Sequence, residues 1–185
     1  PTLWRTARAL ANPDRLNLMY LVANAKGEKG VVELAGEAGL PVSTASTYLR
    51  ALNARGLISV VRVASFVYYG NKSDRSLPAA IAIQEAFRRL FSRKALPKDW
   101  TARLLPLVKG YANPRREEIV RTLCRHQPIR YSELLRRVGF CEASFLRHLD
   151  ILAKAGIVVR DAKSGAYGLP HPRNSLASAF LSSLE

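Results

Sequence analysis

Short hydroxyl side chains and one arginine recur at helical spacing between residues 43 and 50. Hydroxyl and guanidinium groups are suited to hydrogen-bond phosphate oxygens and the edges of bases in a DNA groove. Ala45, Leu49 and Leu52 fall on the opposite side of such a helix and are expected to face a core. The alternative is that Ser43 caps the helix and the others are ordinary surface residues. We favour DNA contact, through Ser43, Thr44, Ser46, Thr47 and Arg50.

A similar segment lies about one hundred residues further along the chain, but it is poorer in such groups. Leu146 occupies a position where a polar contact would be expected, and Asp150 stands where the first segment has Arg50. Because carboxylates repel phosphates, we expect this helix to read DNA less well, and Leu146 beside Phe145 favours a protein contact. The side chains that keep some potential for DNA are Ser144, Arg147 and His148.

An extended segment follows each of these helices. Residues 57–63 and 66–69 flank a tight turn at 64–65 and predict an apolar hairpin, with Arg62 as its main phosphate contact. Residues 157–160 and 166–169 flank a longer polar turn, where Arg160 and Lys163 are placed to contact phosphates. Simple hairpin packing is the alternative for both, and the first hairpin fits it well.

The helices that must position these segments have clear start and stop signals. Asn12-Pro13 and Asn113-Pro114 each predict a helix start, because Asn caps free N–H groups and Pro is tolerated at the first helical position. Further helices are expected over 31–39 and 43–55, and over 131–139 and 142–155. Left-handed turns are expected at the glycines that end them: Gly39, Gly56, Gly139 and Gly156.

These signals recur at an offset of 100 to 101 residues, so the sequence predicts two copies of one domain. Each copy reads as helix, helix, turn, helix and hairpin, which is a winged helix-turn-helix. We expect a mainly α fold with small β-hairpin wings, in which tandem winged helix-turn-helix domains are joined by helices about a pseudo-two-fold axis. The expected bounds are 1–75 for the first domain, 76–98 for a connecting helix and linker, and 99–185 for the second domain with a C-terminal helix.

Two further amphipathic segments follow the wings, at residues 78–94 and 175–184, and a short break is expected at 96–98. Their apolar stripes are too large to leave in water. We expect them to pack together with the helices around Trp4 and Trp100, although the same surface could serve a dimer of two chains. The predicted interface residues are Ile83, Phe87, Leu90, Phe91, Leu176, Phe180, Leu181 and Leu184.

The charge balance favours a polyanionic partner. The chain has 185 residues, 29 Lys and Arg against 14 Asp and Glu, and a formal net charge of +15. Residues 1–75 hold ten basic and five acidic side chains, 76–110 hold seven and two, and 111–185 hold twelve and seven. The excess is therefore even along the chain, as expected where folded domains neutralise phosphates and release counterions.

Other classes of protein are disfavoured. No stretch approaches the roughly 18 apolar residues of a membrane span, and two cysteines suit a reducing cytoplasm, where the chain would associate with the nucleoid. The Cys124/His126 and Cys141/His148 clusters lack the spacing of a metal site, so we predict no metal and no other cofactor. No phosphate-binding loop, carboxylate pair or activated nucleophile is visible, so the chain is not expected to be an enzyme.

Residues 11–16, Ala-Asn-Pro-Asp-Arg-Leu, and the run 40–58 resemble the first helix and the turn with recognition helix of ArsR-type winged-helix repressors. Residues 113–116 and 155–158 resemble the same two segments. The resemblance implies a transcription factor whose terminal helices form a dimer interface and whose third helix enters the major groove. Fusion of two copies implies a pseudo-dimer within one chain or a dimer of such chains.

The expected function is sequence-specific binding of double-stranded DNA by a transcriptional regulator, in the sense of a repressor. One alternative is an architectural or protein-interaction module built from tandem winged helices, which Leu146 and Asp150 favour. RNA binding is a second alternative, which basic charge alone leaves open.

Overall fold

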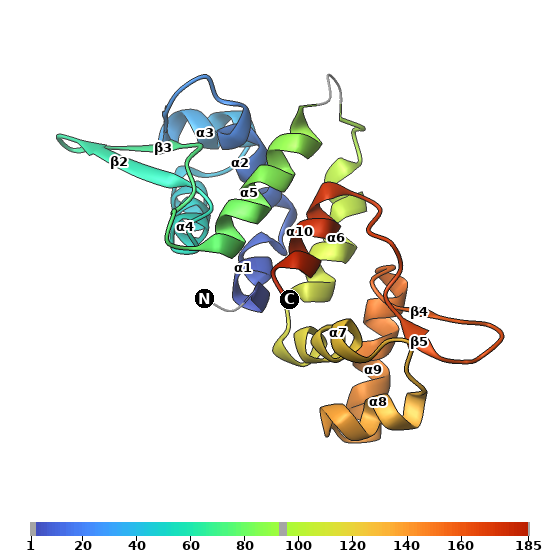
Figure 1. Cartoon of the computed structure of the whole chain (residues 1–185). Helices are drawn as coiled ribbons and strands as arrows, with labels where there is room; N and C mark the ends of the chain where they lie inside the picture. The colour runs from blue at the N-terminus through green and yellow to red at the C-terminus, as the bar shows by residue number, and fades with distance from the viewer. Residues whose placement is uncertain (1–2, 93–95, 185) are drawn as a thin grey trace.

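The computed structural model describes residues 3–92 and 96–184, and the fold is mainly helical with small antiparallel sheets (Figure 1). The ends of the predicted domains at residues 1 and 185, and the end of the helix predicted over 78–94, lie outside the described residues. The first half of the chain forms α1 (Leu3–Leu10), α2 (Pro13–Asn24), β1 (Lys29–Gly30), α3 (Val31–Ala38), α4 (Val42–Asn53), β2 (Ser59–Val63), β3 (Phe66–Gly70) and α5 (Pro78–Phe91).

The second half forms a similar succession of helices with a shorter ladder. Its elements are α6 (Trp100–Tyr111), α7 (Pro114–His126), α8 (Tyr131–Val138), α9 (Glu142–Lys154), β4 (Val159–Arg160), β5 (Tyr167–Gly168) and α10 (Ser175–Ser182). Most element boundaries lie within two or three residues of those expected from the sequence. Within the described ranges, no helix is long and apolar enough to cross a membrane.

The helix starts follow the chemistry expected of Asn-Pro. The Asn12 side chain accepts a hydrogen bond from the Arg15 N–H, and the Asn113 side chain accepts from the N–H groups of Arg115 and Arg116. These bonds satisfy amides that have no partner within the helix. Gly39 and Gly139 end α3 and α8 with φ of 67° and 66°, a left-handed conformation that glycine adopts at low cost.

The larger sheet has the order β1-β3-β2, and both strand pairs are antiparallel. The hairpin runs in register from the pair Ser59 and Gly70 to the pair Val63 and Phe66, so the turn falls at residues 64–65 as expected. In the smaller sheet β4 pairs with β5, and Ile129 forms an isolated bridge with Tyr167.

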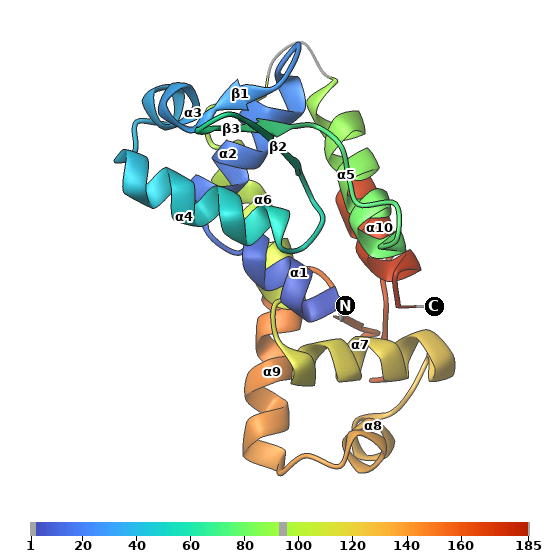
Figure 2. The same cartoon turned by 90° about the vertical axis from the view of Figure 1, so that its left-hand side faces the viewer.

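Helices α5 and α10 lie side by side in the middle of the molecule (Figures 1 and 2). Six of the residues expected at this contact are buried and two are half-buried; the buried ones are Ile83, Phe87, Phe91, Leu176, Phe180 and Leu184, and the others are Leu90 and Leu181. The Ser175 hydroxyl adds a hydrogen bond of 2.9 Å to the Ala86 carbonyl. The apolar faces of both helices are thus removed from water.

Helices α1 and α6 also pack against each other, but their tryptophans differ. Trp100 joins an aromatic cluster with Tyr20 and Phe91, at centroid distances of 5.5 and 5.3 Å. The Trp4 ring is half-buried and lines a surface hollow. Its backbone N–H donates to the Glu117 carboxylate at 2.7 Å, which holds the start of α1 on α7.

His148 was expected to keep some potential for DNA, and this is wrong because α9 turns its ring toward α7. The residue is only 8% exposed, and its Nδ1 is buried without a hydrogen-bond partner among the described residues. Burial lowers the pKa of His148, and the positive charges of Arg116, Arg147 and Arg115 lower it further. The imidazole is therefore neutral in the folded protein near neutral pH.

The central packing predicts a strong dependence of stability on α5. We expect Phe87→Ala, at a fully buried position, to lower the free energy of unfolding by about 3–5 kcal/mol, because it leaves a cavity between packed helices. Phe66→Ala is the matched control, since Phe66 is 64% exposed and its removal should change stability by no more than about 0.5 kcal/mol. Urea unfolding followed by circular dichroism measures both, and equal effects would contradict this account of the core.

The lowered pKa of His148 predicts that stability falls as the solution is acidified. The unfolded chain takes up the proton near the ordinary histidine pKa of about 6.5, before the folded protein does. The stability that the neutral His148 contributes is therefore fully present above about pH 6.5 and is lost below it. The unfolding free energy linked to this residue changes by at most about 1.4 kcal/mol per pH unit. We expect the unfolding free energy of His148→Gln to fall less steeply than that of the parent between about pH 7 and 5. Parallel curves would show that this histidine does not contribute.

Candidate nucleic-acid interface

Helix α4 is held by its apolar face and presents a polar face outward. Ala45, Leu49 and Leu52 are fully buried, which fixes the rotation of the helix. Ser43, Thr47 and Arg50 are separated by four and three residues and therefore lie along one line on the exposed side. Thr44 and Ser46 flank this line and are half-buried. All five predicted contacts thus lie on or beside one outward strip of α4.

Local hydrogen bonds orient two of these side chains. The Thr47 hydroxyl donates to the Ser43 carbonyl at 3.0 Å, and the Arg50 Nε donates to the Ser46 carbonyl at 3.3 Å. The Thr47 oxygen keeps its lone pairs free to accept a hydrogen bond, and the Arg50 guanidinium keeps its other donors. These are groups that can bond to both bases and phosphates.

The first wing stands next to α4. Burial raises the pKa of Tyr69 on β3, while the charges of Arg50 and Arg62 act to lower it, so both arginines lie near the same ring. Arg62 is exposed on β2, as expected for a phosphate contact. The fold therefore brings the arginine of α4 and that of the wing together on one side of the first half of the chain.

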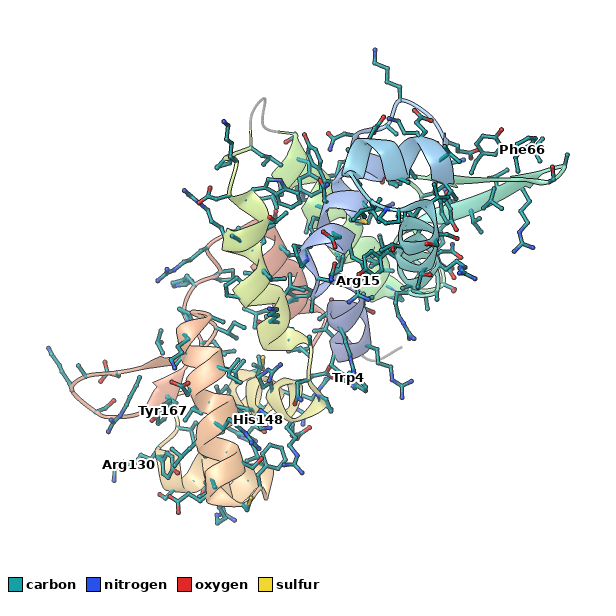
Figure 3. The ribbon with its side chains drawn as sticks, turned by 180° about the vertical axis from the view of Figure 1, so that it is seen from behind. Trp4, Arg15, Phe66, Arg130, His148 and Tyr167 are labelled. Carbon is teal, nitrogen blue, oxygen red and sulfur yellow. The ribbon has the colours of Figure 1, made fainter. Side chains whose placement is uncertain are left out.

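The tip of the first wing does not fit the alternative of simple hairpin packing. The hairpin projects away from the helices (Figure 1), and Phe66 and Val63 near its tip are 64% and 57% exposed. Phe66 marks the far end of the hairpin in Figure 3. The two strands extend beyond the body at this end, so pairing with each other does not cover the side chains near the tip.

In the second half, α9 presents fewer polar groups than α4. The expectation that Ser144 projects outward is wrong: it is only 4% exposed, and its hydroxyl accepts a hydrogen bond of 2.6 Å from Arg115 on α7. Arg147 is exposed as expected, and Leu146 is 49% exposed. Asp150 forms an ion pair of 2.7 Å with Lys154, one turn further along the same helix.

The second wing has a polar turn that Asp161 organises. Its Oδ1 accepts hydrogen bonds from the N–H groups of Lys163 and Ser164 and from the Ser164 hydroxyl. Arg160 donates to the Gly165 carbonyl at 3.2 Å, and its guanidinium carbon lies 5.9 Å from the centroid of the Tyr167 ring. Arg160 and Lys163 are both exposed. The turn therefore holds two cations at the surface, one of them in a fixed orientation.

The structure does not bring all the predicted contacts into one site. Figures 1 and 2 place α4 with β2 and β3 at one end of the molecule and α9 with β4 and β5 at the other, with α5, α6 and α10 between them. The sequence pattern did not predict a basic hollow beside α4, which is lined by arginines from α1, α2 and the turn just after α4. The i, i+3 spacing of Arg5 and Arg8 was the available signal, but which other residues join them depends on tertiary packing.

Metal ligands are not assembled in the described part of the chain: no group of three or more His, Cys, Asp or Glu side chains there could hold an ion. Cys124 is half-buried on α7, and Cys141 is exposed at the start of α9. The absence of a metal requirement stays a prediction.

Comparisons with known proteins agree with the geometry of the first half. Residues 12–60 match the family model described as bacterial regulatory protein, arsR family. A relative named HTH-type transcriptional regulator Rv0324, from Mycobacterium tuberculosis (strain ATCC 25618 / H37Rv), is 38% identical over 65 residues. That match covers 35% of this chain and 28% of the relative's length. No solved structure was found to match.

The matched segment begins at the Asn12 cap, includes α2, α3 and α4, and ends within β2. It thus contains the buried face that fixes α4 and the outward strip of hydroxyl and guanidinium groups. Residues 12–60 are therefore an ArsR-family helix-turn-helix domain.

Proposed function

We propose that this chain is a transcriptional regulator, acting as a repressor, that binds double-stranded DNA in a sequence-specific manner. The observation that carries the proposal is the polar strip of α4, held outward by three fully buried residues within the family-matched segment. A rigidly held helix with hydroxyl and guanidinium groups on its free side is suited to the major groove. The matched relative is itself named a transcriptional regulator.

We further propose that residues 99–184 are a second winged helix related to the first. Four local features support this, because they recur at corresponding places. The Arg15 guanidinium donates to the Arg8 carbonyl, and the Arg116 guanidinium donates to the Lys109 carbonyl, seven residues back in each case. The Asn caps and the left-handed glycines recur as well. So does a pairing of the wing with the chain just before the helix-turn-helix, which joins Lys29 to Tyr69 and Ile129 to Tyr167.

The proposed arrangement is a pseudo-dimer within one chain, with domains at 1–75 and 99–185 joined by 76–98. Elements that lie next to a two-fold axis pack on their own counterparts. The packing of α1 on α6 and of α5 on α10 supports such an axis, since these are the corresponding helices of the two halves. The other assembly that the family resemblance implies is a dimer of two chains.

The two halves contribute differently in this proposal. Base discrimination comes mainly from Ser43, Thr44, Ser46, Thr47 and Arg50 on α4. Arg62, Arg147, Arg160 and Lys163 contact the phosphate backbone. The regulator works without a cofactor or catalysis, in the cytoplasm and on the nucleoid.

One observation favours a different role for α9. Leu146 is half-exposed and apolar, and the neighbouring Asp150 is paired with Lys154, so this strip offers little to a phosphate. A protein partner could therefore occupy α9 while α4 binds DNA. In the extreme case the whole chain is an architectural or protein-interaction module, which the following variants distinguish.

We expect the double variant Thr47→Ala, Arg50→Ala to lose sequence preference. Removing each base contact should cost on the order of 1–3 kcal/mol on a selected site, and binding to random duplex should weaken much less. Both side chains are exposed, so the fold should persist. The measurement is a binding titration on a site selected from random duplex DNA and on bulk DNA.

The matched variant Arg160→Ala, Lys163→Ala should weaken binding to all duplexes alike. The slope of log affinity against log salt should fall by about 0.9 for each phosphate that the variant no longer neutralises. Titrations of both double variants at several salt concentrations give the comparison. If the Thr47/Arg50 variant keeps its sequence preference, or if both variants lose it equally, the protein-interaction function becomes the better description.

A further inference from the structure

A surface hollow of about 560 Å³ lies beside the helix-turn-helix, between α1, the start of α2 and the C-terminal end of α4. Its walls contain four arginines, Arg5 and Arg8 from α1, Arg15 from α2 and Arg55 just after α4. The remaining lining residues are Trp4, Ala9, Ala51 and Ala54. Figure 3 shows Trp4 on α1 and Arg15 near the junction of α1 and α2.

The positive charge of this hollow is not neutralised by the protein. None of the lining residues is acidic, and within the described ranges none of the four arginines forms an ion pair with Asp or Glu. Four guanidinium groups that face one hollow repel one another. An anion bound there would relieve that repulsion and supply the missing acceptors.

Arg15 also lacks a hydrogen-bond acceptor for one of its nitrogen atoms. Its NH2 donates to the Arg8 carbonyl at 3.3 Å, while its Nε is buried and has no acceptor among the described residues. Its guanidinium carbon lies 5.4 Å from the centroid of the Tyr48 ring, which fixes the side chain against α4. Burial lowers the pKa of Arg15, Tyr48 opposes this shift, and the charge of Arg8 adds to it. The side chain is thus held in place with a donor unused.

The hollow is also positioned by contacts that do not depend on a ligand. The Trp4 N–H is bound by Glu117, and Arg5 lies over the Trp4 ring with its guanidinium carbon 5.2 Å from the ring centroid. The start of α1 therefore has a defined place relative to α2 and α4. A site whose cations are already oriented binds an anion without the cost of ordering them.

The hollow continues the polar strip of α4. Ala54 lies on the same line as Ser43, Thr47 and Arg50, because it follows Arg50 by four residues. Ala51 and Ala54 are small and leave the end of α4 accessible between the arginines. A backbone that runs along the polar strip of α4 would therefore reach the hollow next.

We propose that this hollow binds a phosphate group, through the guanidinium groups of Arg5, Arg8 and Arg55. Guanidinium forks match the geometry of phosphate oxygens and bind them in pairs of hydrogen bonds. The phosphate can come from a duplex backbone or from a free phosphate anion, and the position beside α4 favours the duplex. The site does not depend on sequence-specific recognition, so it can exist even if the proposed regulatory function fails.

The test variant is Arg5→Gln, Arg8→Gln, Arg55→Gln, which removes three charges and leaves Arg15 with its contacts to Tyr48 and Arg8. Arg5 and Arg8 are exposed and Arg55 is half-buried. The matched control is Arg88→Gln, Arg89→Gln, Arg125→Gln, which removes the same charge from exposed positions on α5 and α7. Thermal unfolding by circular dichroism checks the fold of both. If the triple variant does not fold, the single variants Arg8→Gln and Arg125→Gln provide the same comparison.

The first arm measures binding to a duplex of random sequence by fluorescence anisotropy at several salt concentrations. If the backbone places a phosphate in the hollow, the salt slope of the triple variant falls by about 0.9, the value for one neutralised phosphate. The control variant leaves the slope nearly unchanged, because its charges lie on α5 and α7, away from α4.

The second arm titrates sodium pyrophosphate into a Trp100→Phe background, where Trp4 is the remaining tryptophan. Potassium chloride at equal ionic strength is the reference. Binding in the hollow gives a saturable change in Trp4 fluorescence, which the arginine-to-glutamine triple variant loses and the control keeps.

A fall in salt slope confined to the triple variant supports the site and identifies the duplex backbone as its ligand. A pyrophosphate response without that fall supports the site and identifies a free anion. The proposal is overturned if the triple and control variants behave alike in both arms. If the protein shows no preference for a selected DNA site, the proposed regulatory function fails. Both comparisons still test the phosphate site, because neither depends on sequence preference.

Discussion

The burial of α5 against α10 is the interaction on which the arrangement of the molecule depends. Both helices carry apolar stripes, which would be exposed to water without a partner. Packing them together removes both stripes from water, and the Phe87 and Phe180 side chains are fully buried as a result. Helices α1 and α6 also pack against each other.

From this centre the positions of the surface groups follow. With α5, α6 and α10 in the middle, α4 and α9 lie at opposite ends of the molecule (Figure 1). Buried residues fix the rotation of each helix, so the same contacts that stabilise the fold select which side chains remain outside. On α4 these are hydroxyls and Arg50, and on α9 they include Leu146 and an ion-paired Asp150. The different roles proposed for the two halves rest on that difference.

The charge of the protein is distributed in a way that composition does not reveal. An even excess of basic residues along the chain is compatible with many surfaces. In the folded protein four arginines from separate elements line one hollow beside α4, and Glu117 anchors the helix that carries two of them. The start of α1 thus joins the surface on which the proposed DNA contacts lie.

Local features of this fold could be predicted from the sequence because they depend on neighbouring residues. Asn-Pro pairs start α2 and α7, glycines in the left-handed conformation end α3 and α8, and the first hairpin turns at residues 64–65. The line of Ser43, Thr47 and Arg50 on α4 also follows from helical periodicity, since Ala45, Leu49 and Leu52 define the buried side. By itself the sequence therefore determined these helix starts and ends, the first hairpin turn and the outward strip of α4.

Which side chains of α9 and of the first hairpin are covered was decided by the tertiary structure alone. Ser144 and His148 have types and spacing that suit a surface, yet α7 covers both and Arg115 binds the serine. Phe66 belongs to a hairpin apolar enough to pack, yet it is 64% exposed near the tip. Whether a polar or apolar side chain is buried depends on what lies across from it in space, and periodicity describes only the element that carries it.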